Sequence, residues 1–305
     1  MGDLNSLPLP ELFAVLTGDV AFVRALDAAL KEDLGPAGDI TTMSIIDPAR
    51  RGAAMIVARR EGIVAGLELV PHLLRRIDGG IEFEPAARDG ASVAAGATLG
   101  ALRGPLGPML SLERTMLNYL GHLAGIATLT QAYVRAVADT AAVICDTRKT
   151  TPGLRRLEKY AVRCGGGTLH RLGLYDAALY KDNHLAYLPP DAMADVLVRA
   201  IERARAEHAP GFVEVEVDSL DQLERVLEIP EGLVDIILLD NMAPEMMRQA
   251  VRRRDECRSA VRLEASGGVD LANVGRIAET GVDRISVGAI THSAPWLDIA
   301  LDVAA

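Results

Sequence analysis

The chain contains few cysteines, and their number argues against a fold stabilised by disulfides. Only Cys145, Cys164 and Cys257 occur in 305 residues. Secreted domains that depend on disulfides carry many cysteines, usually in even number. The sparse and odd count is typical of a protein in a reducing compartment, so we expect a cytoplasmic location.

Long apolar runs and an excess of positive charge are also missing, and we expect no secretory signal. No stretch of about 18 residues lacks both a charge and a helix breaker, so we expect no membrane span. Residues 1–12 (MGDLNSLPLPEL) lack the basic start and apolar run of a secretory signal. The chain has 32 lysines and arginines against 42 acidic residues, a net charge of −10. This balance argues against a general nucleic-acid binder, which needs a basic surface.

The sequence does contain enough apolar residues for a large core, and one window of concentrated positive charge. Half of the residues are apolar, and a chain of this length buries roughly three quarters of its unfolded surface. Residues 145–185 hold eight lysines and arginines against four acidic residues. This basic window, in a chain that is acidic overall, predicts a site for anions.

The order of the expected elements indicates an α/β protein with two domains. The first third mixes short strands with helices, including helices over Val20–Leu34, Leu110–Leu123 and Ile126–Val137, the last two separated near Gly125. From about residue 140, strands and helices alternate in about six β/α units, which is typical of a parallel sheet with outer helices. The expected strands are Ala142–Cys145, Ala177–Tyr180, Phe212–Val217, Val234–Leu239, Val261–Ala265 and Arg284–Val287. The expected helices are Gly153–Val162, Asp191–His208, Leu220–Leu227, Pro244–Arg254 and Leu271–Thr280.

Polar and glycine-rich clusters follow nearly every expected strand, which helps to choose between an open sheet and a barrel. In both architectures the site lies at the carboxyl ends of the strands. Only a barrel brings all of these ends round one mouth, so we favour a barrel over residues 126–289. The mixed strands and helices of the first part are expected to form a separate α+β domain.

The glycine-rich turns after the last two strands suggest a phosphate site. Ser266, Gly267 and Gly268 follow one strand, and Gly288 follows the next. In barrels these two loops commonly hold a phosphate, because backbone N–H groups and a helix start point at the anion. The alternative is a pair of ordinary tight turns.

Cations at strand ends form a second candidate group. Arg148 and Lys149 follow one strand, Lys181 follows the next, and His170 and Arg171 come after a triple glycine. Guanidinium groups suit carboxylates and phosphates. The alternative, a solvated basic face, fits the helix residues Arg155, Arg156 and Lys159 better.

Acidic residues on one strand suggest a metal site. Glu214, Glu216 and Asp218 alternate with valine, so all three point to the same side. Glu216 or Asp218, with Asp240 from the next strand, could hold Mg²⁺ together with substrate oxygens. The alternative is that they pair with nearby lysines and arginines.

These residues lie in motifs that resemble quinolinate phosphoribosyltransferase, the carboxylating nicotinate-nucleotide pyrophosphorylase. The motifs of the barrel part are 146–155 (DTRKTTPGLR), 159–163 (KYAVR), 165–171 (GGGTLHR), 181–184 (KDNH), 214–218 (EVEVD), 238–241 (LLDN) and 266–268 (SGG). Those of the first part are 32–35 (EDLG), 38–42 (GDITT) and 112–118 (LERTMLN). The resemblance covers nearly the whole chain. It implies an N-terminal α/β sandwich domain over residues 1–125, joined by residues 290–305, and an incomplete (β/α) TIM-like barrel. It also implies a homodimer or a higher oligomer with shared active sites.

The resemblance also implies a reaction and a role for each matched residue. The family transfers phosphoribosyl from 5-phosphoribosyl-1-pyrophosphate to quinolinate, and nicotinate mononucleotide, pyrophosphate and CO₂ leave. The implied quinolinate residues are Arg148, His170 and Arg171, with Arg114 from the other subunit. Lys149 and Lys181 are implied to lie between the substrates, Glu216 and Asp240 near the ribose and Mg²⁺, and Ser266, Gly267, Gly268 and Gly288 at the 5-phosphate.

One departure from the family pattern leaves rival interpretations open. Leu169 stands where the family usually has asparagine, so the amide hydrogen bond beside His170 is lost. A phosphoribosyltransferase-like paralogue encoded with molybdate transporters is a close alternative. A barrel lyase that forms a Schiff base on Lys149 or Lys181 and a non-catalytic metabolite sensor are more distant ones. No nucleic acid or membrane partner is expected.

Overall fold

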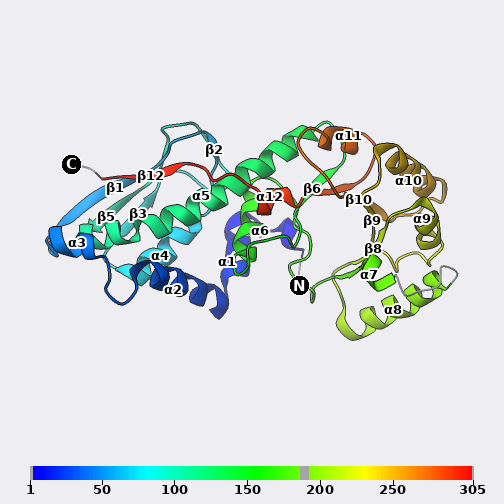
Figure 1. Ribbon diagram of the computed structural model, residues 1–305, viewed down its shortest axis with the longest axis horizontal. Helices are drawn as coiled ribbons and strands as arrows, with labels where there is room; N and C mark the ends of the chain where they lie inside the picture. Colours follow the sequence, from blue (N-terminus) through cyan, green and yellow to red (C-terminus); the bar gives the residue numbers. More distant parts are fainter. Residues whose placement is uncertain (1–2, 186–191, 304–305) are drawn as a thin grey trace. The chain divides into compact units, whose positions relative to one another are not determined.

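The computed structural model describes residues 3–185 and 192–303, and their contacts divide the chain into two units (Figure 1). The barrel unit comprises residues 132–149 and 167–289. The sandwich unit comprises residues 3–131, 150–166 and 290–303. The expected helix start at Asp191 lies outside the described residues.

An antiparallel sheet forms the frame of the sandwich unit. Its strand order is β12-β1-β5-β3, and a two-stranded sheet, β2-β4, accompanies it. The C-terminal strand lies at one edge, where Val303 pairs with Ala54. The strands are β1 (Arg51–Ala58), β2 (Gly62–Ile63), β3 (Glu82–Pro85), β4 (Ser92–Val93), β5 (Thr98–Pro105) and β12 (Ile299–Val303).

Helices of the sandwich unit accompany these sheets. The helices are α1 (Leu9–Thr17), α2 (Val20–Leu34), α3 (Ile40–Ile45), α4 (Val70–Ile77), α5 (Leu106–Ala136, whose last turn belongs to the barrel unit) and α6 (Arg155–Cys164). Helix α2 has the expected bounds, because Asp19 caps its first turn and Gly35, with a φ of +53°, ends it.

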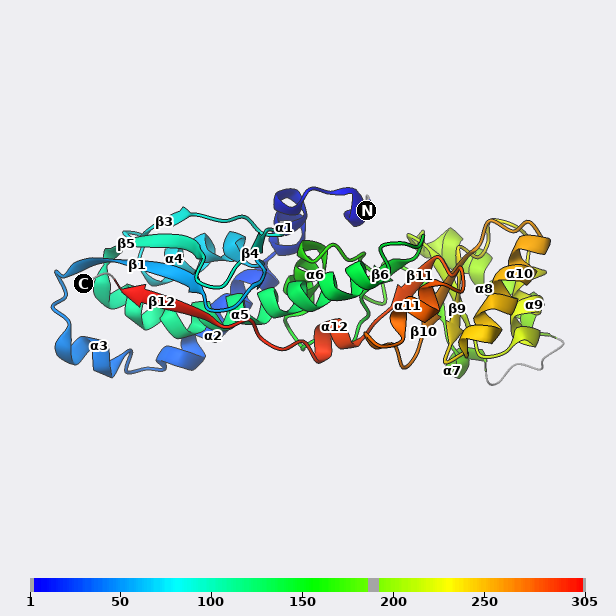
Figure 2. The same ribbon diagram turned by 90° about the horizontal axis from the view of Figure 1, so that it is seen from above.

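Helix α5 is one continuous helix, so the expected interruption near Gly125 is wrong (Figures 1 and 2). A Cβ at Gly125 would lie 2.2 Å from the backbone oxygen of Pro295. The glycine therefore permits close packing of the C-terminal segment against the helix rather than a break in it.

Helix α6 joins the sandwich unit, although its sequence lies between two barrel strands. The rings of Tyr160 on α6 and Phe13 on α1 are 5.1 Å apart at a steep angle, and Arg156 pairs with Asp19. The expectation that Arg155, Arg156 and Lys159 form a solvated face is wrong for Lys159, which is completely buried. Packing against α1 covers a side of α6 that its charges alone would place in water.

Six parallel strands form the barrel unit in the order β6-β11-β10-β9-β8-β7. The first strand pairs with the last, and the remaining strands follow in sequence, as in a barrel rather than in a doubly wound sheet. In the part of the chain that the structure describes, no pairing joins β6 to β7, so the barrel is incomplete. The strands are β6 (Val143–Cys145), β7 (Ala178–Tyr180), β8 (Val213–Val217), β9 (Ile236–Asp240), β10 (Arg262–Ser266) and β11 (Arg284–Ser286). The predicted α/β class with a TIM-like barrel is confirmed.

Helices cover the outside of this sheet. Helices α9 and α10 lie on the same side of strands β8 and β9 (Figure 1). The helices of this part are α7 (Asp182–Leu185), α8 (Met193–His208), α9 (Leu220–Leu227), α10 (Pro244–Glu256), α11 (Val274–Ala278) and α12 (Ala289–His292) at the boundary of the units. Among the described residues, none of the helices has the length and apolar character needed to cross a bilayer.

Candidate active site

The carboxyl ends of the barrel strands carry most of the residues that the sequence singled out. Lys181 directly follows β7, and Glu216 lies near the end of β8. Asp240 and Ser266 are the last residues of β9 and β10 and face each other in register. Because parallel strands end at one edge of the sheet, the fold brings these side chains to one mouth.

Lys181 is held in place at this mouth by two contacts. Its Nζ forms an ion pair with Glu216, whose side chain is almost buried. Its backbone N–H donates to Nδ1 of His184 over 2.9 Å. His184 therefore helps to orient the backbone at Lys181.

The glycine turn after β10 has a backbone that only glycine adopts easily. Gly267 has a φ of +94°, and a Cβ there would lie 2.1 Å from Oδ1 of Asn241. Gly268 also has a positive φ, and its carbonyl accepts a hydrogen bond from Nδ2 of Asn273 over 2.8 Å. Such a turn lets backbone N–H groups approach an anion closely. Gly288 lies two residues beyond β11, at the same edge of the sheet.

Two guanidinium groups of the basic window lie near each other. Burial and the nearby Arg148 together lower the pKa of Arg171. Nη1 of Arg171 donates to the carbonyl of Ala177 over 3.1 Å, which fixes this buried side chain. Lys149 follows Arg148, and its backbone N–H donates to Oγ1 of Thr147 over 3.0 Å. Both side chains are guanidinium groups, which suit the carboxylates or phosphates of an anion.

His170 lies in the barrel interior, and both of its ring nitrogens have partners there. Nδ1 accepts the backbone N–H of Arg171 over 2.8 Å. Nε2 lies 2.9 Å from Glu214 and 3.5 Å from Glu264. Because Nδ1 is an acceptor, the geometry assigns the ring proton to Nε2. Burial would lower the pKa of His170, but the two glutamates outweigh it and raise this pKa.

The same two glutamates have opposite pKa shifts because their partners differ. Burial and the neighbouring Glu264 raise the pKa of Glu214. Burial acts in the same direction on Glu264, but His170 and Arg284 outweigh it and lower its pKa. Nε of Arg284 lies 2.6 Å from Oε2 of Glu264. His170, Glu214 and Glu264 have the spacing of a metal site, but the adjacent guanidinium opposes a cation there.

The comparisons with known proteins cover both units. The protein-family model for the quinolinate phosphoribosyl transferase C-terminal domain matches residues 126–302, and the family model for the N-terminal domain matches residues 39–124. The chain belongs to the quinolinate phosphoribosyltransferase family. A carboxylating nicotinate-nucleotide pyrophosphorylase of Mycobacterium leprae is 45% identical over 294 residues, which is 94% of this chain and all of the relative.

Solved structures of this family resemble the chain over nearly its whole length. The nicotinate-nucleotide pyrophosphorylase of Francisella tularensis has a TM-score of 0.84 and 34% identity, and each chain is covered completely. That of Ehrlichia chaffeensis has a TM-score of 0.82 and 37% identity, covering 94% of this chain and all of the other.

Arg114 is the one candidate that does not lie with the others in the barrel unit. It occupies an exposed position on α5, within the sandwich unit. The resemblance to the phosphoribosyltransferase family implies that this residue acts in the site of a second subunit, and this role stays a prediction.

Sequence reasoning missed the buried charges below the mouth. Glu264 and Arg284 were not singled out, and Glu214 was considered only for its direction along β8. Charged residues on strands that are otherwise apolar are the signal that could have found them, since such charges are rarely buried without a partner.

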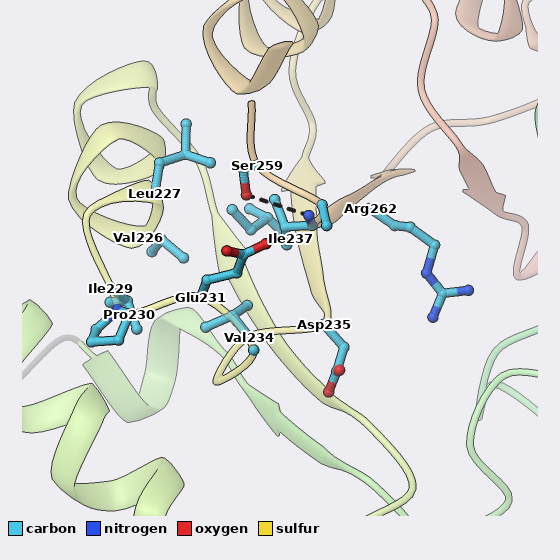
Figure 3. Close-up of a pocket in the computed structure, with 13 residues that line it drawn as sticks. Val226, Leu227, Ile229, Pro230, Glu231, Val234, Asp235, Ile237, Ser259 and Arg262 are labelled. Atoms are coloured by element: carbon cyan, nitrogen blue, oxygen red, sulfur yellow. Dashed lines mark hydrogen bonds between the residues drawn. The ribbon is translucent and has the colours of Figure 1, made fainter. Parts of the chain in front are cut away.

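A further pocket lies at the opposite edge of the barrel sheet, near the starts of β9 and β10 (Figure 3). It has a volume of about 270 Å³, and Glu231, Asp235, Ser259 and Arg262 contribute its polar side chains. The amino-terminal face of a barrel generally serves stability rather than chemistry. We therefore place the active site at the strand ends and not in this pocket.

Proposed function

We propose that this chain transfers the phosphoribosyl group of 5-phosphoribosyl-1-pyrophosphate to the ring nitrogen of quinolinate, with release of pyrophosphate and CO₂. The product is nicotinate mononucleotide, a precursor of NAD. The observation that carries the proposal is the arrangement at one barrel mouth. An ion-paired lysine and a glycine turn lie at the ends of its strands, and two arginines of the same unit interact electrostatically, in a chain whose full-length relatives are named for this reaction.

The residues of the mouth suit the two substrates. Arg148 and Arg171 match the carboxylates of quinolinate, because a guanidinium binds a carboxylate through two parallel hydrogen bonds. The turn from Ser266 to Gly268, with Gly288, suits the 5-phosphate. Lys149 and Lys181 supply positive charge between these two subsites, where pyrophosphate leaves.

The chemistry then follows from positioning and charge. The lone pair of the pyridine nitrogen forms a bond to C1 of the ribose as the bond to pyrophosphate breaks. Cations at the mouth stabilise the departing charge, and holding both substrates together supplies much of the rate. The ribosylated ring is cationic and accepts the electron pair left by CO₂, after which C2 takes a proton. No general base is needed, because the pyridine nitrogen carries no proton.

Glu216 and Asp240 are the residues that we propose for Mg²⁺. Glu216 pairs in register with Leu238, two residues before Asp240, so both carboxylates project from the same face of the sheet. Hard carboxylate oxygens are suitable ligands for this ion. Bound with the pyrophosphate, Mg²⁺ would stabilise the charge of the leaving group.

Metal removal tests this assignment. We expect EDTA to abolish the activity and added Mg²⁺ to restore it. Asp240→Asn should raise the Mg²⁺ concentration that gives half-maximal activity, because one negative ligand becomes neutral. Activity that persists in excess EDTA would contradict a role for the ion.

We also propose that the enzyme is a homodimer with shared sites. The sandwich unit exposes three large apolar side chains on the short helix α3, namely Ile40, Met43 and Ile45. Exposed apolar groups of this kind are typical of protein–protein interfaces. The exposed position of Arg114 on α5 suits a contact with a second copy.

The decisive assay supplies quinolinate, 5-phosphoribosyl-1-pyrophosphate and Mg²⁺ and follows nicotinate mononucleotide and CO₂. We expect both products in equal amounts. No product despite tight quinolinate binding would indicate a metabolite sensor. A substrate adduct trapped by borohydride on Lys149 or Lys181 would instead support a Schiff-base lyase, which the pairing of the Lys181 ammonium with Glu216 disfavours.

A further inference from the structure

A chain of buried charges runs beneath the basic residues of the mouth. It consists of His170, Glu214, Glu264 and Arg284, whose exposed fractions are 8, 0, 0 and 6%. All four belong to the barrel unit. The proposed reaction assigns no role to Glu214, Glu264 or Arg284.

The curvature of the sheet brings these residues together. Glu214 lies on β8 and Glu264 on β10, with β9 between them. Strands two positions apart are separated by roughly 10 Å, yet oxygens of the two carboxylates lie within 4.8 Å of each other. Both side chains therefore project from the concave face, toward the barrel axis. Arg284 faces Glu264 directly across β10 and β11.

Because these charged side chains are buried, each of them needs a partner of opposite charge or a hydrogen bond. Removing a carboxylate from water costs several kcal/mol unless a cation and hydrogen bonds compensate. Arg284 compensates Glu264 through the 2.6 Å contact between Nε and Oε2. The other oxygen of Glu264 lies 3.5 Å from Nε2 of His170, which lies 2.9 Å from Glu214. Glu264 therefore acts on the ring through its charge rather than through a hydrogen bond, and Arg284 holds that charge in place.

His170 connects these buried charges to Arg171. Its backbone N–H donates to Oδ1 of Asp146 over 2.7 Å, and its Nδ1 accepts the N–H of Arg171 over 2.8 Å. The ring orientation thus fixes the peptide from which the Arg171 side chain starts. That side chain is already buried and bonded to Ala177, so a turned ring would displace the guanidinium.

We propose that Glu264 and Arg284 are positioning residues for the quinolinate subsite, acting through the His170 ring on the Arg171 guanidinium. This inference rests on the proposed function. It assigns the pair to quinolinate binding specifically, since the chain of contacts ends at Arg171 and not at the glycine turn.

The test compares Michaelis constants for the two substrates. We expect Arg284→Gln to raise KM for quinolinate about tenfold, because a small misplacement of a binding group is costly. KM for 5-phosphoribosyl-1-pyrophosphate should stay within about twofold. Arg284→Lys keeps the charge opposite Glu264 and should restore most of the quinolinate affinity.

A second variant covers the case in which Arg284→Gln does not fold. Arg284→Gln leaves a buried carboxylate without its cation, whereas Glu264→Gln/Arg284→Gln removes both charges together. We expect the double variant to fold and to show the same selective rise in KM for quinolinate. The effects of substitutions at two residues that act through one contact do not add. The rise in KM of the double variant should therefore not exceed that of a folded single variant.

The matched control breaks another ion pair of the barrel unit. Arg254 lies 2.6 Å from Asp283, which directly precedes β11 and lies at the end of the strand opposite to its carboxyl end. Arg254→Gln should lower the melting temperature and leave the ratio of the two Michaelis constants unchanged.

The outcomes separate this inference from the proposed function. Absence of nicotinate mononucleotide with the unmodified enzyme would overturn the proposed function itself. An active unmodified enzyme whose Arg284 and Glu264 variants change both Michaelis constants equally, or neither, would overturn the positioning role. Calorimetric titration with quinolinate alone gives the binding change independently of turnover.

Discussion

At the scale of single residues, Gly267 connects the backbone of the barrel to the proposed phosphate subsite. Its φ of +94° lies in the region that favours glycine, and the space where a Cβ would stand is filled by the Asn241 amide. Asn241 itself has a φ of +53° and donates from its backbone to the carbonyl of Ser266 over 2.9 Å. The turn is therefore fixed by two neighbouring strands at once.

Substitution of Gly267 tests whether the shape of this turn determines binding at the proposed phosphate subsite. We expect Gly267→Ala to raise KM for 5-phosphoribosyl-1-pyrophosphate about tenfold or more, because the new methyl group forces the turn away from Asn241. The control is Gly232→Ala, since Gly232 also has a positive φ but nothing lies within 4 Å of its Cβ position. Steady-state rates at varied substrate provide the measurement. Equal effects of the two variants would show that backbone strain alone is responsible.

Individual residues also show what the sequence can reveal about the site. Lys181, Asp240 and Ser266 could be predicted because polar residues directly after apolar strands have few structural explanations. Glu264 and Arg284 could not, since their meaning depends on which strands become neighbours. The burial of Lys159 could not be predicted either, since its charge and its place on a helix favour an exposed position.

At the scale of elements, helix α5 illustrates the ambiguity of a glycine in a helical pattern. The sequence suggested a break near Gly125, whereas the structure has one helix from Leu106 to Ala136. A glycine breaks a helix in isolation, but it also allows another backbone to approach. Only the position of Pro295, on a segment about 170 residues later, distinguishes the two cases.

The close approach of Pro295 predicts that Gly125→Ala destabilises the protein, although alanine favours a helix more than glycine does. Alanine gains roughly 1 kcal/mol of helix propensity over glycine, but a Cβ 2.2 Å from the Pro295 oxygen must displace the C-terminal segment. Overpacking of this kind costs about 1–3 kcal/mol. We therefore expect a lower midpoint in urea unfolding.

Gly107→Ala, in the first turn of the same helix, is the control for that measurement. A Cβ there meets only the methyl group of Thr42, at 3.4 Å. This variant should be neutral or slightly stabilising. A stabilised Gly125→Ala protein would show that the C-terminal segment moves aside without cost.

The element order of the barrel was the most predictable part of the fold. Regular alternation of strands and helices follows directly from hydrophobic period, and each expected strand after residue 140 is present within a few residues. The strand pairing of the sandwich unit was harder to predict, because β1 pairs with β12 from the other end of the chain. A local sequence pattern does not indicate which strand, so distant in the sequence, becomes the neighbour.

At the scale of the whole molecule, the candidate residues are divided between the two units. Arg148 and Arg171 lie in the barrel unit, and Arg114 lies in the sandwich unit. If a complete site uses Arg114 from one subunit and the barrel of another, each dimer has two sites of mixed origin. Defects in different units then need not fall on the same site.

Mixed dimers test this division directly. Arg114→Ala and Arg171→Ala should each lower kcat/KM by roughly a hundredfold or more, since each removes a charged contact to the substrate. In a heterodimer of the two variants, one site carries both defects and the other carries none. We expect mixing with subunit exchange to restore up to about a quarter of the unmodified activity, because half of the dimers are mixed and half of their sites are intact. Exchange is verified with differently tagged subunits. Confirmed exchange without recovered activity would mean that Arg114 serves its own subunit, and the site would then be complete within one chain.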